Sequence, residues 1–166
     1  MKVLVAYASK HGATAEIAQA IAEVLRGSGH DADVAAAEIA PAPDAYEAIV
    51  LGSAIYAGSW LEPATAYARA HAAAIAARPA WLFSSGPLGE PEPPLEDQPA
   101  ELDELARLLR PRWHTLFAGR YDPEALGFGE RAIMTAVKAA PGDYRNWDRI
   151  RRWAGDVAGE LSRESA

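Results

Sequence analysis

The chain has 166 residues, which predicts one domain over residues 1–166 that buries roughly two thirds of its unfolded surface. It contains no cysteine, which excludes disulfide bonds, thiol redox chemistry and iron–sulfur clusters held by cysteine. The formal net charge of −7 argues against a nucleic-acid-binding surface. Any electrons that the protein transfers must therefore be carried by a bound organic cofactor.

The first predicted strand covers residues 2–7 and is followed by a helix over 15–26, whose apolar residues recur at helical spacing. The loop between them leaves backbone N–H groups at the start of the helix, where the helix dipole favours an anion. We therefore predict a phosphate site with Lys10 and His11 at its rim, formed by Ser9, Lys10, His11, Gly12, Ala13 and Thr14. The alternative is an ordinary strand-to-helix turn capped by Thr14.

This loop has neither the Gly-x-x-x-x-Gly-Lys-Ser/Thr pattern of nucleoside-triphosphate loops nor the Gly-x-Gly-x-x-Gly pattern of dinucleotide sites. It resembles the phosphate loop of flavodoxins, in which hydroxyl residues and a glycine precede a threonine at a helix start. The flavodoxin loop wraps the terminal phosphate of FMN. The resemblance therefore implies FMN as the cofactor.

A second strand is predicted at residues 31–35 and a third at 48–51, a short apolar run typical of a parallel sheet. Small residues and two aromatic residues follow the third strand. We expect this loop to bind the edge of a flavin ring through its backbone, with Tyr56 or Trp60 against the ring face. The predicted binding residues are Ser53, Ala54, Ile55, Tyr56, Ala57, Gly58 and Trp60. Alternatively, the two aromatic residues pack on the sheet edge or form a homo-oligomer contact.

A helix over residues 61–77 precedes the fourth strand at 80–83, which leads into a third loop rich in glycine and proline. The backbone of this loop is expected to reach the polar edge of the flavin, and its predicted binding residues are Ser84, Ser85, Gly86, Pro87, Leu88 and Gly89. Further elements are a helix over 100–109, a fifth strand near 114–118, a helix over 129–139 and a final helix capped by Asn146.

Strands that alternate with helices predict an α/β fold, a five-stranded parallel sheet that is doubly wound and covered by helices on both faces. The expected architecture is three-layered and flavodoxin-like, with strand order 2-1-3-4-5. All three candidate loops then lie at the carboxyl edge of the sheet, where open α/β sheets bind their ligands.

Four stretches are similar to the flavodoxin-domain family of menaquinone-dependent protoporphyrinogen oxidases: the phosphate loop at residues 7–14, residues 52–61, residues 117–120 and residues 141–147. The similarity extends from near Lys2 to about Leu161. It implies an FMN oxidoreductase that oxidises a tetrapyrrole precursor and passes the electrons to a quinone. The chain has Ile55-Tyr56-Ala57-Gly58 where characterised members tend to carry Ile-Arg-Tyr-Gly.

The excess negative charge lies in one segment, because residues 79–106 contain no lysine or arginine. This segment has seven acidic residues, Glu90, Glu92, Glu96, Asp97, Glu101, Asp103 and Glu104. It either docks a basic redox-partner protein, as expected of a flavodoxin-type electron carrier, or is a solvated loop without a partner. The family members instead carry a basic insert after the fourth strand.

Three functional hypotheses follow: an FMN oxidoreductase, an electron carrier, and a flavodoxin-like shell without flavin. No catalytic acid or base is assigned, since His11 and His114 are candidates by location only. We expect no metal site.

We expect a cytoplasmic location, because no apolar run approaches the ~18 residues of a membrane span. The final helix carries arginines beside Trp147 and Trp153, so we expect at most weak peripheral contact with the inner face of the membrane.

Overall fold

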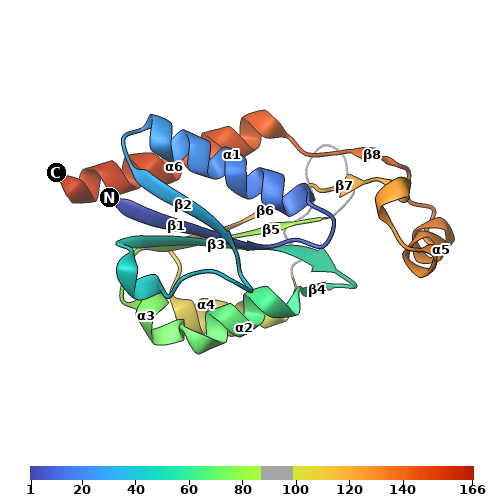
Figure 1. Cartoon of the computed structure of the whole chain (residues 1–166), viewed down its shortest axis with the longest axis horizontal. Coiled ribbons are helices and arrows are strands. Elements are labelled where there is room, and N and C mark those ends of the chain that lie inside the picture. Colours follow the sequence, from blue (N-terminus) through green and yellow to red (C-terminus); the bar gives the residue numbers. More distant parts are fainter. Residues whose placement is uncertain (87–98) are drawn as a thin grey trace.

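Five parallel strands form the central sheet of the computed structural model, which describes residues 1–86 and 99–166 (Figure 1). The strands lie in the order β2-β1-β3-β5-β6. Their bounds are Lys2–Ala8 (β1), Asp31–Ala36 (β2), Ala48–Tyr56 (β3), Ala80–Ser85 (β5) and Trp113–Phe117 (β6). A short strand, β4 (Ser59–Trp60), pairs antiparallel with the end of β3. The expected order 2-1-3-4-5 is confirmed, because β5 and β6 are the fourth and fifth parallel strands.

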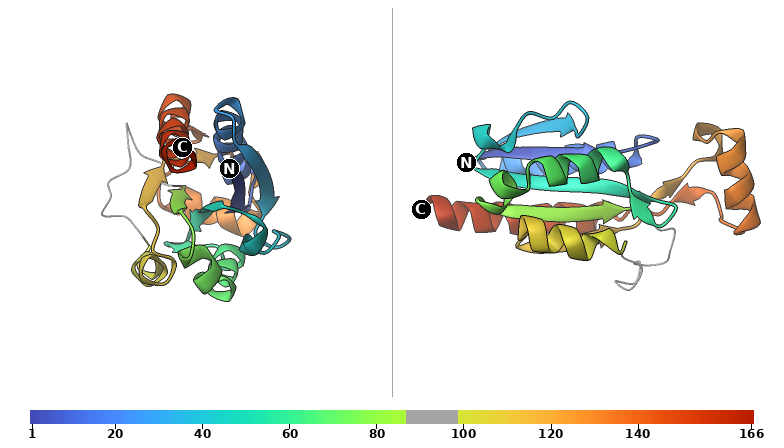
Figure 2. Two further views of the ribbon diagram at one scale, coloured as in Figure 1. Left: turned by 90° about the vertical axis from the view of Figure 1, so that its left-hand side faces the viewer. Right: turned by 90° about the horizontal axis from the view of Figure 1, so that it is seen from below.

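Helices cover both faces of the sheet, as the alternating pattern predicted (Figures 1 and 2). One face carries α1 (Ala13–Gly27) and α6 (Trp147–Ser165), and the other carries α2 (Glu62–Ala70), α3 (Ala72–Ala76) and α4 (Glu101–Leu109). The side chain of Asn146 caps α6 by accepting a hydrogen bond from the backbone N–H of Arg149 at 3.0 Å. No helix within residues 1–86 and 99–166 is both long and apolar enough to cross a membrane.

The expected single helix over residues 61–77 is divided at His71, whose backbone is not helical (φ −116°, ψ 19°). The His71 ring lies 4.6 Å from the ring of Tyr67, between centroids. The surrounding alanines fit a helix equally well on either side of the break. The division therefore has no sequence signal.

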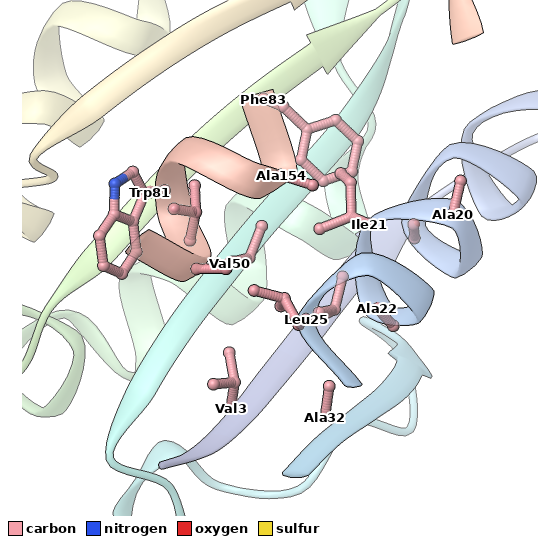
Figure 3. Packing of buried hydrophobic residues seen from close by; sticks show 14 of the residues in the cluster. Val3, Ala20, Ile21, Ala22, Leu25, Ala32, Val50, Trp81, Phe83 and Ala154 are labelled. Carbon is pink, nitrogen blue, oxygen red and sulfur yellow. The ribbon is translucent and has the colours of Figure 1, made fainter. Parts of the chain in front are cut away.

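Alternating residues of the strands face the two helical layers. Figure 3 shows Ile21 and Leu25 of α1 beside Val50 and Phe83 of the sheet, within the cluster that α6 completes. Gly52 of β3 lies against the same ring: a Cβ atom at this position would lie 2.1 Å from Cζ of Phe83. The tight packing at this point holds β3 and β5 in place just before both strands reach the carboxyl edge of the sheet.

A segment between β6 and α6 projects beyond the carboxyl edge of the sheet (Figures 1 and 2). We call residues 119–146 the projecting arm. It contains β7 (Arg120–Tyr121), a 3-10 turn (Pro123–Ala125), α5 (Phe128–Ala136) and β8 (Gly142–Asp143), and β7 and β8 pair antiparallel. The sequence predicted the helix but not the two strands, which are too short to show a periodic pattern.

Candidate functional site

A cavity of about 670 Å³ opens at the carboxyl edge of the sheet, between the body of the fold and the projecting arm. Each of the three loops predicted to bind a ligand contributes to its wall. The predicted residues that line it are Ser9, Lys10, His11, Ala13, Thr14, Ala54, Ile55, Tyr56, Ala57, Ser85 and Gly86. The arm supplies the opposite wall, including Arg120, Glu130, Ile133, Met134 and Val137.

The phosphate loop leaves the start of α1 without a side-chain cap. Gly12 is the N-cap residue and has a positive φ of 88°, a conformation that glycine adopts without strain. Thr14 lies inside the first turn of α1, so the alternative turn capped by Thr14 is not the arrangement found. The N–H groups of a first helical turn have no partner within the helix, so they remain available to an anion.

Two buried hydroxyl groups at the cavity lack hydrogen-bond partners among the described residues. Thr14 is 2% exposed and Ser85 is 1% exposed, and both residues line the cavity from different loops. A buried hydroxyl without a partner costs free energy, so such groups normally bind another polar atom. The pair therefore indicates a ligand that presents polar groups to both loops.

Three other residues that the sequence predicted as ligands are directed into the fold instead. The Ser53 hydroxyl donates to the carbonyl of Ala54 at 2.8 Å and accepts from the N–H of Leu61 at 3.0 Å. The Ser84 hydroxyl accepts from Nε1 of Trp60 at 2.8 Å, and Trp60 is buried in the core. Neither serine nor Trp60 lines the cavity.

The inward positions of the two serines follow from the length of the strands. β3 continues to Tyr56 and β5 to Ser85, beyond the expected ends at residues 51 and 83, so Ser53 and Ser84 belong to strands and not to loops. Side chains of a strand alternate between the two faces of the sheet, and these two point into the fold. Gly58 also lies outside the cavity lining. The predicted ligands Pro87, Leu88 and Gly89 lie outside the described residues.

Tyr56 is the aromatic residue of the second loop that faces the cavity. The Nζ atom of Lys10 lies 3.9 Å from the centre of its ring, a cation–π contact between the phosphate loop and the second loop. Of the two aromatic residues expected to cover a flavin ring, only Tyr56 is placed to do so. The arm adds Tyr121 and Tyr144 to the lining. Neither was predicted as a ligand, although Tyr144 lies in the motif at residues 141–147.

The cavity rim contains a cluster of charged residues from both sides. The Glu130 carboxylate of α5 lies 3.2 Å from Lys10 Nζ and 2.7 Å from His11 Nε2. The hydrogen bond with His11, supported by the one with Lys10, holds the pKa of Glu130 below its usual value. Since 119 residues separate His11 from Glu130, no local motif could have predicted this contact.

Two arginines fix the ends of the arm to the start of α1. Arg120 donates to the carbonyl of His11 at 3.3 Å and forms an ion pair with Glu16 at 3.3 Å. Arg145, whose side chain is 4% exposed, binds Asp143 through two hydrogen bonds of 2.8 Å and donates to the carbonyl of Ala13 at 3.1 Å. Arg145 also pairs with Glu16. The arm is thus attached beside the predicted phosphate site.

His114, one of the two histidines considered for acid–base chemistry, does not line the cavity. Its Nε2 lies 2.9 Å from the Ser84 hydroxyl. Burial lowers the pKa of His114 to about 4, so the ring is neutral near pH 7. A structural role suits these surroundings better than proton transfer to a ligand in the cavity.

The arrangement suits an organic phosphate with a flat ring. A phosphate group is favoured by the uncapped helix start, by the cations Lys10 and Arg120 and by two hydroxyls that have no partner in the described part of the chain. Tyr56 and the apolar side of α5 favour a ring. These features lie in one cavity large enough for a cofactor. The chain therefore has a binding site for a phosphorylated aromatic cofactor.

Comparison with protein families agrees with this geometry. The chain matches the model of a family described as Flavodoxin domain over residues 4–148. No protein of curated function matches it significantly.

Solved structures share its fold at low sequence identity. A flavodoxin from the domain Archaea aligns with a TM-score of 0.62 at 20% identity, covering 98% of this chain and 99% of the other. The Flv1 flavodiiron core from Synechocystis sp. PCC6803 aligns with a TM-score of 0.68 at 18% identity, over 36% of its length. Rubredoxin oxygen:oxidoreductase from Desulfovibrio gigas aligns with a TM-score of 0.65 at 14% identity, over 37% of its length. Each alignment includes 99% of this chain.

Proposed function

Because this chain belongs to the flavodoxin domain family, we propose that it is an electron carrier that holds FMN in the cavity and exchanges electrons with a redox-partner protein. Flavodoxin itself binds FMN at the point where the strand order of the sheet reverses, between its first and third strands. Here the corresponding strands are β1 and β3, which end at the phosphate loop and at Tyr56. FMN is therefore the cofactor of this chain.

Each wall of the cavity would hold a different part of FMN. The N–H groups at the start of α1 and the hydroxyls of Ser9 and Thr14 would bind the phosphate, and Tyr56 would lie against the ring. Backbone groups of residues 54–57 and 85–86 would bind the polar ring edge. Bound FMN supplies the redox chemistry, and the protein positions it and shields it from water.

The observation that carries this proposal is the pair of buried hydroxyls at Thr14 and Ser85, which have no hydrogen-bond partner within residues 1–86 and 99–166. They belong to two loops that are 71 residues apart in sequence, and they line the same cavity as the uncapped start of α1. A phosphorylated cofactor with a polar ring explains both groups.

Replacing Thr14 by valine tests the proposed phosphate site, because the substitution removes the hydroxyl and keeps the shape of the side chain. We expect FMN binding to weaken about tenfold or more, as is typical for the loss of a hydrogen bond to a charged group. Riboflavin lacks the phosphate and serves as the control, so its affinity should stay unchanged. Quenching of flavin fluorescence measures both affinities.

An equal loss of FMN and riboflavin affinity in Thr14→Val would show that Thr14 does not bind the phosphate. Thr14→Ser retains the hydroxyl and should bind FMN nearly as well as the native protein. No binding of FMN to the native protein would remove the proposed function altogether.

The acidic segment supports a basic protein as the redox partner. Its described members Glu101, Asp103 and Glu104 lie in the first turn of α4. Glu101 accepts a hydrogen bond from the N–H of Trp60 at 2.6 Å, and Glu104 forms an exposed ion pair with Arg69 at 3.2 Å. Docking through these charges would be weakened by salt, because exposed charges are screened over about 10 Å at 0.1 M.

A second candidate is the quinone-dependent oxidase that the family resemblance implies, with a tetrapyrrole precursor as electron donor. The apolar side chains of Ile133, Met134 and Val137 in the cavity wall favour it, because they would suit a small apolar redox substrate beside the cofactor. Such an oxidase would meet its quinone at the inner face of the membrane, whereas a carrier would remain in the cytoplasm.

Anaerobic stopped-flow oxidation of the reduced FMN protein distinguishes the two candidates. A carrier should be reoxidised rapidly by cytochrome c, a basic one-electron acceptor, at a rate that falls as salt rises. An oxidase should react rapidly with a soluble quinone and should also be reduced by protoporphyrinogen, seen as bleaching of the flavin spectrum. Slow reaction with cytochrome c at low salt would contradict the carrier.

A further inference from the structure

Helix α5 of the projecting arm lacks the apolar packing that holds the other helices in place. No residue of α5 is buried, and Phe128, Ile133 and Val137 are 89%, 61% and 65% exposed. A nine-residue helix is too short to be stable alone in water, so its position depends on the few contacts that it makes with the body. Those contacts therefore decide whether the outer wall of the cavity is present.

Among the described residues, α5 forms side-chain hydrogen bonds and ion pairs with the body only through Glu130. Its carboxylate reaches across to the phosphate loop, at 3.2 Å from Lys10 Nζ and 2.7 Å from His11 Nε2. Lys10 in turn lies over the ring of Tyr56. One carboxylate thus connects the arm, the phosphate loop and the second loop.

We propose that Glu130 is a positioning residue that fastens α5 across the phosphate loop, so that the arm closes the cofactor cavity and slows the release of FMN. The inference rests on the proposed function, since it assigns FMN to the cavity. Opening of the Glu130 contacts frees the outer wall while Arg120 and Arg145 keep both ends of the arm attached to α1. The cofactor then leaves through the side from which α5 has moved.

A different role for Glu130 would give the opposite result. A carboxylate near a bound phosphate repels it and competes for Lys10 and His11, in which case removal of the charge would strengthen FMN binding. The fastening role predicts faster FMN release without Glu130, and the repulsion predicts slower release. The sign of the change therefore separates the two roles.

The test compares Glu130→Gln with the matched control Glu124→Gln, which removes a charge from the same arm at an exposed side chain without a described partner. We expect FMN to dissociate about fivefold faster from Glu130→Gln, a typical effect of losing a partly exposed ion pair. The rate is measured by the rise of FMN fluorescence on dilution. Glu124→Gln should behave like the native protein.

Two further measurements separate fastening from a local effect on the phosphate. Trypsin should cut the FMN-free Glu130→Gln protein faster at the exposed residues Arg131 and Lys138, because α5 leaves the body more often. Salt should accelerate FMN release from the native protein more than from the variant, since the ion pairs that salt screens are already absent from the variant.

Unchanged or slower FMN release from Glu130→Gln would overturn the proposal, and so would unchanged tryptic cleavage. Because cleavage is measured without cofactor, it tests the fastening even if the chain binds no FMN. A protein that shows the cleavage difference and fails to bind FMN would refute the proposed function and the effect on FMN release, and would leave only the attachment of the arm.

Discussion

Single residues at the carboxyl edge of the sheet decide how closely the strands and loops approach. Gly119 and Gly86 illustrate this, because a Cβ atom at residue 119 would lie 2.6 Å from Cα of Gly86. The ends of β6 and β5 can therefore meet only without a side chain at this point. The cavity wall that Ser85 and Gly86 form depends on this contact.

Gly52→Ala should destabilise the protein, because the new methyl group would lie 2.1 Å from the Phe83 ring. That ring is held by contacts with Phe117 and Trp153 and has little room to move. We expect a loss of about 1–3 kcal/mol in the free energy of unfolding, measured by urea denaturation. Gly155→Ala in α6 is the control: nothing lies within 4 Å of its Cβ position, so it should stabilise by up to about 1 kcal/mol.

The buried ring of His114 should make stability depend on pH. Its pKa is lowered from 6.5 to about 4 in the folded protein, so the unfolded chain binds a proton at a pH where the folded protein does not. Above pH 6.5 the neutral His114 ring does not reduce the free energy of unfolding. As the pH falls from 6.5 to 4, up to about 3 kcal/mol of this free energy is lost.

The variant His114→Asn cannot titrate at this position, so its unfolding free energy should fall less steeply over the same pH range. Urea denaturation at several pH values measures both slopes. Parallel slopes would mean that folding does not lower the pKa of His114.

At the scale of elements, the arm is the least expected part of the structure. The fold elsewhere uses strands and helices long enough to show a period of two or 3.6 residues, whereas β7 and β8 contain two residues each. They are held by the arginines at the two ends of the arm. The geometry of the arm thus follows from contacts that are distant in sequence.

Arg145→Lys should loosen the arm, because one ammonium group cannot replace the two hydrogen bonds to Asp143 together with those to Ala13 and Glu16. Hydrogen exchange of the backbone amides in β7 and β8 should become at least several-fold faster. The control is Arg131→Lys, an exposed residue for which no partner is described. Equal exchange in both variants would show that Arg145 does not anchor the arm.

At the scale of the whole molecule, the sequence predicted the strand order and the edge at which three loops meet. Short apolar runs such as residues 48–51 identify buried parallel strands, and the chirality of their connections leaves few topologies. The inward positions of Ser53, Ser84 and Trp60 were missed because the strands extend further than the apolar runs. The contacts of Glu130 could not be predicted, because they depend on how the arm folds back onto the phosphate loop, and no local sequence pattern shows this.

The attachment of the arm to α1 also bears on how the protein is made. Arg120 follows its partner Glu16 by 104 residues, and Arg145 follows Ala13 by 132 residues. Because the ribosome builds a chain from its N-terminal side, the phosphate loop emerges before the arm that forms the outer wall of the cavity. The cavity is therefore completed only after the arm has been made, and stable loading of the cofactor must follow the synthesis of Arg145.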